Sequence, residues 1–143
     1  TIKSLTEKLT KNPDDAGTLY RRGQVYASKG AYSLAIKDFD ATIRLNPKDV
    51  EAYNNRCWTR TVIGDLQSAL RDCNEALRLR PNFVDALDSR GLLNLKSGAN
   101  KNAIADFDAA LPTRLAAVTR DDVLRVARGY LSPRAAVLIV PGP

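Results

Sequence analysis

Histidine is absent from the 143-residue chain, and cysteine occurs only twice. Without imidazole, the chain has no histidine to act as general base, general acid or metal ligand. Two cysteines without histidine do not complete a four-ligand structural zinc site. The sequence also lacks an apolar run of about 18 residues, the length that a membrane-spanning helix needs. We therefore expect no metal, no cofactor and no membrane span.

Catalytic patterns are also missing. No pair of acids, no nucleophile with a neighbouring base and no phosphate-binding loop stands out in the sequence. These constellations are what most enzyme mechanisms require. The sequence therefore predicts a protein that is not an enzyme and has no catalytic residues.

The net charge of +6 is spread along the chain, with its highest density towards the C-terminal end. A nucleic-acid-binding protein usually gathers Lys and Arg on one face or stripe, and no such stripe is visible here. Nucleic acid is therefore not the expected partner, and a nucleic-acid-binding helical array stays a third alternative that rests on the pI of 9.5.

The start of the chain does not identify a compartment. Residues 1–11 alternate polar and apolar side chains and do not form a secretory signal. The chain begins without Met, as it would if an upstream signal had been removed. The localisation is therefore unknown, with the cytoplasm and, after signal removal, the periplasm as the two options.

A repeat with a period of 34 residues runs through the sequence. Pro13, Pro47 and Pro81 share this spacing, and a fixed period of this length is typical of stacked structural units. Four more columns keep the same register: Gly23, Cys57 and Gly91; Ala35, Ala69 and Ala103; Phe39, Cys73 and Phe107; and Gly30, Gly64 and Gly98. Several independent columns at one period indicate true repetition.

Each period predicts two helices. Apolar residues recur at three- and four-residue spacing, glycine stands between the two segments, and proline follows the second. The expected helices are 16–29, 32–45, 50–63, 65–79, 84–97 and 99–111. The columns of small residues predict that the two helices of a pair cross closely.

These columns resemble the tetratricopeptide repeat family. The residues that carry the resemblance are Leu19, Gly23, Tyr26, Ala35, Phe39 and Pro47; Tyr53, Cys57, Ala69, Cys73, Ala76 and Pro81; and Leu87, Gly91, Ala103, Phe107 and Ala110. The resemblance implies an all-α fold, a right-handed superhelix of stacked antiparallel helix pairs. We expect about three units with a preceding helix, a capping helix and an extended C-terminal tail. The expected divisions are 1–15, 16–49, 50–83, 84–111 and 112–143.

One departure from the family pattern is itself regular. Arg22, Arg56 and Arg90 stand where the family often has Leu, and Asp38, Asp72 and Asp106 follow sixteen residues later. Guanidinium and carboxylate groups pair through two parallel hydrogen bonds. We interpret the columns as structural ion pairs that link either the two helices of each repeat or each repeat to its neighbour. The alternative is a row of arginines that binds an acidic ligand.

The resemblance also implies a concave groove, lined by the first helix of each pair. Such faces bind extended segments or helices. The expected lining residues are Tyr20, Arg21, Gln24, Asn54, Asn55, Trp58, Thr61, Asp88, Ser89, Leu92 and Leu95. Of the carboxylate clamp by which some family members bind chaperone tails, only Asn55 is present, so that ligand is not expected.

Cys57 and Cys73 fall in two inward columns of the same repeat. Two buried thiols are favoured over a disulfide, which would need Cα atoms within about 7 Å of each other.

The repeat pattern stops after Leu111, and Pro112 is expected to end the last repeat helix early. Thr119 predicts an N-cap, with Asp121 and Asp122 in the first turn of a helix that reaches about residue 131. Repeat arrays need a cap over the last apolar face, and this helix is the expected cap.

The apolar residues 135–140 have three readings: they lie extended against their own array, are disordered, or dock on a neighbouring molecule, which would form a homodimer through residues 134–141. Residues 117–143 also resemble the helix-then-strand ending of pitrilysin-like zinc peptidase domains. Because the chain has no histidine, no peptidase activity is carried over.

The sequence thus favours a protein–protein interaction module that binds an unidentified protein or peptide segment in the groove. The main alternative is a self-assembling structural subunit that associates through its apolar tail.

Overall fold

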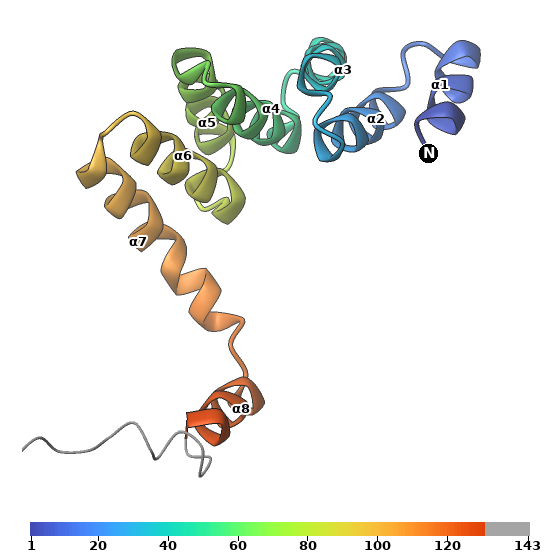
Figure 1. Ribbon diagram of the computed structural model, residues 1–143. Helices are drawn as coiled ribbons and strands as arrows, with labels where there is room; N and C mark the ends of the chain where they lie inside the picture. The colour runs from blue at the N-terminus through green and yellow to red at the C-terminus, as the bar shows by residue number, and fades with distance from the viewer. Residues whose placement is uncertain (131–143) are drawn as a thin grey trace, which may run out of the picture. The chain divides into compact units, whose positions relative to one another are not determined.

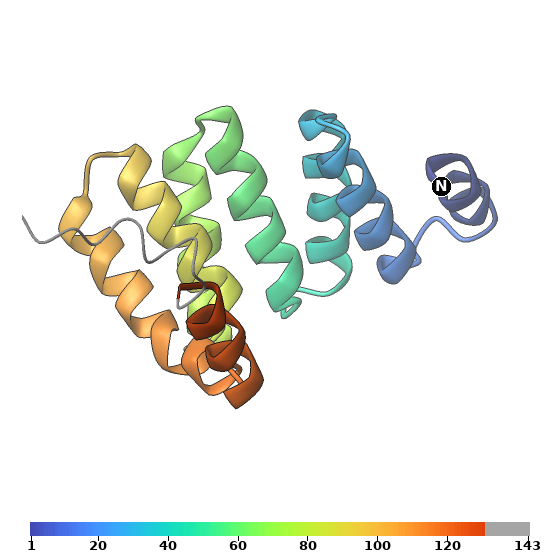
Figure 2. The ribbon, with the colours of Figure 1, turned by 60° about the horizontal axis from the view of Figure 1, so that its bottom comes forward.

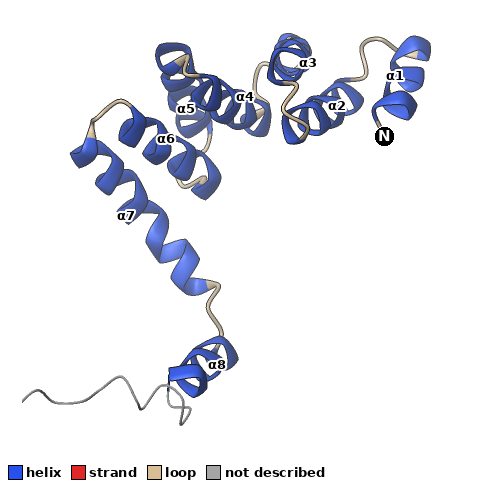
Figure 3. Ribbon diagram, viewed as in Figure 1, coloured by secondary structure: helices blue, strands red, loops and turns tan. Residues whose placement is uncertain are grey.

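The computed structural model describes residues 1–130, and every regular element among them is a helix (Figure 3). Two compact units follow one another in the chain, Thr1–Ala110 and Leu111–Pro143. The predicted all-helical fold is confirmed, with the elements α1 (Ile2–Lys11), α2 (Ala16–Ser28), α3 (Tyr32–Leu45), α4 (Val50–Ile63), α5 (Leu66–Leu79), α6 (Val84–Lys96), α7 (Asn100–Ala116) and α8 (Arg120–Tyr130) (Figure 1).

Within the first unit the helices form pairs. The helix α2 packs against α3, and α4 packs against α5 (Figure 2). Hydrogen bonds join α6 to the first part of α7 in the same way. We call α2, α4 and α6 the first helices, and α1, α3, α5 and α7 the second helices. The first helices also pack against one another in succession, so one surface of the unit is built from them alone.

Caps and turns explain where the helices begin and end. The carboxylates of Asp15 and Asp49 accept hydrogen bonds from the third backbone N–H of α2 and α4, which would otherwise lack a helical partner. Gly30, Gly64 and Gly98 adopt φ values of +77°, +88° and +79° between the helices of a pair. Only glycine takes this backbone conformation without strain, which accounts for the glycine column.

The core of the first unit follows the small-residue columns. Ala35, Ala69 and Ala103 are fully buried where the two helices of each pair cross. Between pairs, Ala76 and Leu77 of α5 pack on Ala86 and Leu87 of α6. Close helix contact and larger apolar side chains therefore alternate along the stack.

The helix α7 corrects one expectation. It continues through Pro112 to Ala116 rather than ending near residue 111. Proline removes one backbone hydrogen bond and strains the preceding turn, but the remaining bonds of a helix can hold it together across this position. The last buried residue of α7 is Ala110, so the helix extends beyond the packed repeat unit.

The second unit contains α8 among its described residues. The hydroxyl Oγ1 of Thr119 accepts a hydrogen bond from the N–H of Asp122 at 3.1 Å, and Oδ2 of Asp122 accepts one from the N–H of Thr119 at 3.0 Å. This reciprocal capping box confirms the predicted N-cap. The capping role of α8 stays a prediction, and the predicted extended tail and homodimer contact lie outside the described residues.

No helix among residues 1–130 combines the length and the hydropathy that crossing a bilayer requires.

Candidate functional site

The surface made by the first helices is the candidate binding face. Consecutive first helices are joined by hydrogen bonds between residues 35 positions apart. Asn55 Nδ2 donates to Tyr20 OH at 2.7 Å, Ser89 Oγ donates to Asn54 Oδ1 at 2.8 Å, and Lys96 Nζ donates to the Thr61 carbonyl at 3.2 Å. These bonds fix the spacing of α2, α4 and α6, and with it the layout of the exposed side chains.

Tyr20 is the centre of a polar network on this face. Its hydroxyl donates to Glu51 Oε2 at 3.2 Å and accepts hydrogen bonds from Asn55 at 2.7 Å and Gln24 at 2.9 Å. Partial burial and the negative charge of Glu51 both disfavour the phenolate, and they raise the pKa of Tyr20 to about 12. The network holds Tyr20 as a neutral, rigid aromatic side chain.

The predicted lining residues divide by exposure. Trp58 is 39% exposed and Leu95 is 48% exposed, so both present apolar surface. Arg21 and Gln24 are exposed as well, while Tyr20, Asn55, Asp88 and Leu92 are half-buried.

Three of the predicted lining residues are buried instead. Asn54 and Ser89 bond to each other between α4 and α6, and Thr61 Oγ1 donates to the Cys57 carbonyl inside α4. Asn54 and Ser89 are covered where α4 and α6 pack against each other, and Lys96 of α6 reaches across to the carbonyl of Thr61. These three positions therefore do not belong to the surface that a ligand can reach.

The arginine and aspartate columns meet inside each helix pair. Nη2 of Arg22 lies 2.7 Å from Asp38 Oδ1, and Nε lies 2.8 Å from Oδ2. Arg56 reaches Asp72 at 2.7 Å and 2.9 Å, and Arg90 reaches Asp106 at 2.6 Å and 3.0 Å. The hydrogen bond to Asp38 also raises the pKa of Arg22. These guanidinium groups are engaged by carboxylates within the unit rather than presented to an acidic ligand.

Each of these arginines has a second partner that the sequence analysis missed. The third guanidinium nitrogen, Nη1, donates to the second helix of the preceding pair: to Thr6 Oγ1 at 3.2 Å, Asp40 Oδ1 at 2.7 Å and Asn74 Oδ1 at 3.0 Å. Thr6, Asp40 and Asn74 form a column with the same 34-residue period, and this column was the available signal. We call Arg22, Arg56 and Arg90, together with their contacts inside and between the pairs, the arginine ladder.

Cys57 and Cys73 form a disulfide with a Cα–Cα distance of 5.4 Å, which corrects the expectation of two buried thiols. Both residues are fully buried. In the flanking pairs the same two columns hold glycine and phenylalanine, and the ring of Phe39 or Phe107 packs on Gly23 or Gly91. The disulfide thus takes the place of a ring-on-glycine contact.

Comparison with known structures identifies the same fold. A crystal structure of MamA shares 23% sequence identity with a TM-score of 0.73, over 78% of this chain and 65% of that chain. A second crystal structure of MamA shares 19% identity with a TM-score of 0.74, over 99% and 87% of the two chains. MamA from residue 41 to its end, from Desulfovibrio magneticus RS-1, shares 19% identity with a TM-score of 0.75, over 82% and 67%. At this identity the likeness shows the fold alone.

The chain spans 65% of the length of the first of these structures. Among curated proteins, none matches the sequence.

Family models give the assignment. Two models, both described as tetratricopeptide repeat, match residues 16–49 and 63–118, which together make up more than half of the chain. The resemblance of the tail to pitrilysin-like peptidases is not supported by these matches. Repeats of this family are protein-interaction modules. The repeated columns of the sequence, the paired helices of the structure and the two matched ranges all indicate the same repeat, and the chain belongs to the tetratricopeptide repeat family.

Proposed function

We propose that the protein is a non-enzymatic interaction module that binds a segment of a protein partner on the face of its first helices. The observation that carries this proposal is Trp58, a tryptophan on α4 that is 39% exposed. Large, rigid aromatic side chains supply much of the energy of protein interfaces. An exposed tryptophan on a repeat face is better explained by a partner than by the stability of the array.

The surroundings of Trp58 favour a segment with mixed character. Towards α2, the face offers the polar network of Tyr20, Gln24 and Asn55. Towards α6, it offers the apolar side chains of Leu92 and Leu95. An amide group such as Asn55 provides a donor and an acceptor for the backbone of an extended peptide. A bound segment would therefore place backbone or polar groups near α2 and apolar side chains near α6.

The arginine ladder supports protein rather than nucleic acid as the partner. Its guanidinium groups are already bonded to Asp38, Asp72 and Asp106. Without these arginines the face lacks the line of free cations that phosphate groups require.

Site-specific photo-crosslinking tests the proposal. A photoreactive phenylalanine analogue would replace Trp58 in one protein and the exposed Lys37 of α3 in a matched control. We expect defined crosslinked bands from position 58 and fewer or none from position 37. The double variant Trp58→Ala with Asn55→Ala should lose partner capture by tenfold or more, in the range of a binding hot spot of about 2 kcal/mol. Equal capture by wild type and this variant would remove the face from consideration.

A further inference from the structure

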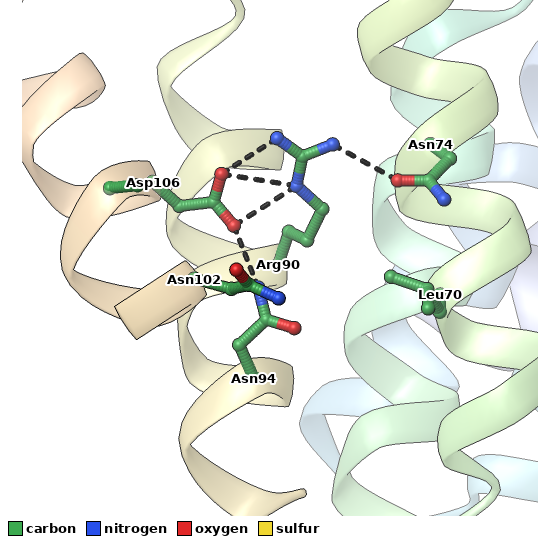
Figure 4. Close-up of a pocket in the computed structure, with 7 residues that line it drawn as sticks. Leu70, Asn74, Arg90, Asn94, Asn102 and Asp106 are labelled. Carbon is green, nitrogen blue, oxygen red and sulfur yellow. Dashed lines mark hydrogen bonds and ion pairs between the residues drawn. The ribbon is translucent and has the colours of Figure 1, made fainter. Parts of the chain in front are cut away.

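A second polar surface lies away from the first-helix face. A cavity of about 390 Å³ opens between α5, α6 and the first part of α7, and the residues that line it all belong to the first unit (Figure 4). None of the predicted groove residues lines this cavity. Its walls carry three asparagine amides, an ion pair and two apolar side chains: Asn74, Asn94, Asn102, Arg90, Asp106, Leu70 and Ala105.

Two of these amides have orientations that chemistry fixes. Arg90 Nη1 donates to Asn74 Oδ1 at 3.0 Å. Because guanidinium has only donors, Asn74 must present its oxygen to Arg90, and its nitrogen faces elsewhere. Asn94 Nδ2 donates to Asp106 Oδ2 at 2.9 Å. Because an ionised carboxylate only accepts, Asn94 must present its nitrogen to Asp106, and its oxygen faces elsewhere.

Asn74 of α5 and Asn94 of α6 both line the cavity. In Figure 4 Asn74 and Leu70 lie on α5 across the space from Asn94 of α6, and the oxygen of Asn94 points towards α5. Neither the amide nitrogen of Asn74 nor the amide oxygen of Asn94 has a hydrogen-bond partner within residues 1–130. Asn94 as a whole residue is only 7% exposed, and it lines the cavity. A bound group would exchange its hydrogen bonds with water for hydrogen bonds to these two amide atoms.

The repeat itself shows why the cavity exists. The position of Asn94 is held by Arg60 in the preceding pair, where Nη1 lies 2.7 Å from Asp72 Oδ2 and Nη2 lies 4.0 Å from Asp40 Oδ1. Asn94 is shorter than Arg60, and Asn74 on α5 stands at the position that Asp40 holds on α3. The cavity is therefore the place that a guanidinium fills one repeat earlier.

Charge decides which group fits the cavity. Arg60 and Asp40 are opposite charges, and one repeat later both are replaced by neutral amides, Asn94 of α6 and Asn74 of α5. Arg90 and Asp106 already neutralise each other. A second cation beside Arg90 would meet a like charge without the compensation that Asp40 gives to Arg60. A neutral, planar group with one donor end and one acceptor end matches the walls better.

We propose that this cavity binds a primary carboxamide, the side chain of a glutamine or asparagine from a protein partner. The carbonyl oxygen accepts from Asn74 Nδ2, and the amide nitrogen donates to Asn94 Oδ1. Leu70 and Ala105 contact the methylene groups of the incoming side chain. The site is independent of the first-helix face, so either can be wrong without the other.

Small probes test the chemistry on the full chain. N-acetyl-glutamine methylamide would be titrated while the side-chain amide resonances of Asn74 and Asn94 are followed by ¹⁵N NMR. We expect saturating shifts at both residues, with affinity at least tenfold above that of the glutamate analogue. The alanine analogue has only main-chain amides, and it should bind no better than the glutamate analogue. Equal shifts with the alanine analogue would overturn the assignment to a side-chain carboxamide.

Two variants make the test specific. Asn94→Arg copies Arg60, fills the cavity with the chain's own guanidinium, and should abolish the shift at Asn74. Asn74→Asp copies Asp40 and keeps a partner for Arg90, but it removes the donor. Glutamine affinity should then fall at least tenfold, and the arginine analogue should become the better ligand.

Gln24→Ala, on the first-helix face, is the matched control and should leave binding unchanged. Thermal unfolding by circular dichroism checks that each variant is folded. If Asn94→Arg does not fold, Asn74→Asp alone decides the matter. Unchanged glutamine affinity in a folded Asn74→Asp protein would overturn the proposal.

Discussion

In the pairs α2/α3 and α6/α7 a phenylalanine ring packs on a glycine, whereas in α4/α5 a disulfide occupies the same two columns. Both arrangements hold the helices where they cross. The ring-on-glycine contact relies on close packing, since a Cβ at Gly23 would lie 2.7 Å from Phe39 Cε1. The disulfide relies on a covalent link between the two helices. These two columns therefore set how closely the helices of a pair cross, and either a packed ring or a disulfide can hold the helices at that distance.

The largest effect is expected from removing a ring. Phe39 is fully buried, so Phe39→Ala leaves a cavity in α2/α3 and should cost about 3–5 kcal/mol of unfolding free energy. Urea unfolding followed by circular dichroism measures the loss. Leu34→Ala, at a residue that is 45% exposed on the same helix, should change stability much less. Similar losses in the two variants would mean that the ring does not hold the pair.

Removing the disulfide should have the next largest effect. The double variant Cys57→Ala with Cys73→Ala frees a loop of 16 residues, and it should cost about 3 kcal/mol. The exchange Cys57→Gly with Cys73→Phe installs the neighbours' contact instead. Burial of the new ring should recover about 2 kcal/mol relative to the double alanine variant. If the exchange is the less stable of the two, the columns are not interchangeable.

A smaller effect is expected from filling the glycine. In Gly91→Ala the new Cβ would lie 2.5 Å from Phe107 Cε1, so the ring must move. Overpacking costs about 1–3 kcal/mol, and the better helix propensity of alanine returns about 1 kcal/mol. We expect a net loss of about 1 kcal/mol in urea unfolding. Gly17→Ala is the control, because its nearest neighbour is 3.5 Å away, and a gain in stability is expected there.

The smallest effect concerns the contacts between pairs. The α2–α4 contact uses Tyr20, while the α4–α6 contact uses the pair Asn54 and Ser89. Because folding raises the pKa of Tyr20 from 10.0 to about 12, its contribution is complete below pH 10 and is lost as the pH rises through about 12.

Urea midpoints measured across this pH range test the difference between the two contacts. Wild type should lose more stability between pH 10 and pH 12 than Tyr20→Phe does. Ser89→Ala should lower stability by the same amount at every pH. Parallel curves for wild type and Tyr20→Phe would contradict the assigned cause.

Periodicity predicted most of the fold. Six expected helices lie within two residues of the observed bounds, apart from the end of α7. That end was wrong because Pro112 was treated as a stop, although proline removes only one hydrogen bond from a helix. The tetratricopeptide resemblance and the columns agree because both report the same close helix crossings.

Local pairing was harder to predict. Cys57 and Cys73 can be buried equally well as two thiols or as a disulfide, so the sequence pattern did not distinguish between these two states. Thr61 and Ser89 were placed on the groove from the family register, but their burial depends on how neighbouring first helices pack against each other. The cavity beside Asn94 was missed because it forms where a shorter side chain replaces a longer one. This replacement is visible only when Asn94 is compared with Arg60, its equivalent one repeat earlier.

The arginine ladder also determines how neighbouring pairs depend on one another. Arg56 bonds to Asp40 of the preceding pair and to Asp72 of its own, so melting either pair leaves a charge without its partner. Nearest-neighbour coupling of this kind makes repeat arrays unfold cooperatively. Arg22 bonds to Asp38 of its own pair, but its partner on the preceding helix α1 is the hydroxyl of Thr6, an exposed and uncharged acceptor. The coupling of α1 to the pair α2/α3 is therefore weaker than the coupling of α3 to the pair α4/α5, where Arg56 meets the charged Asp40.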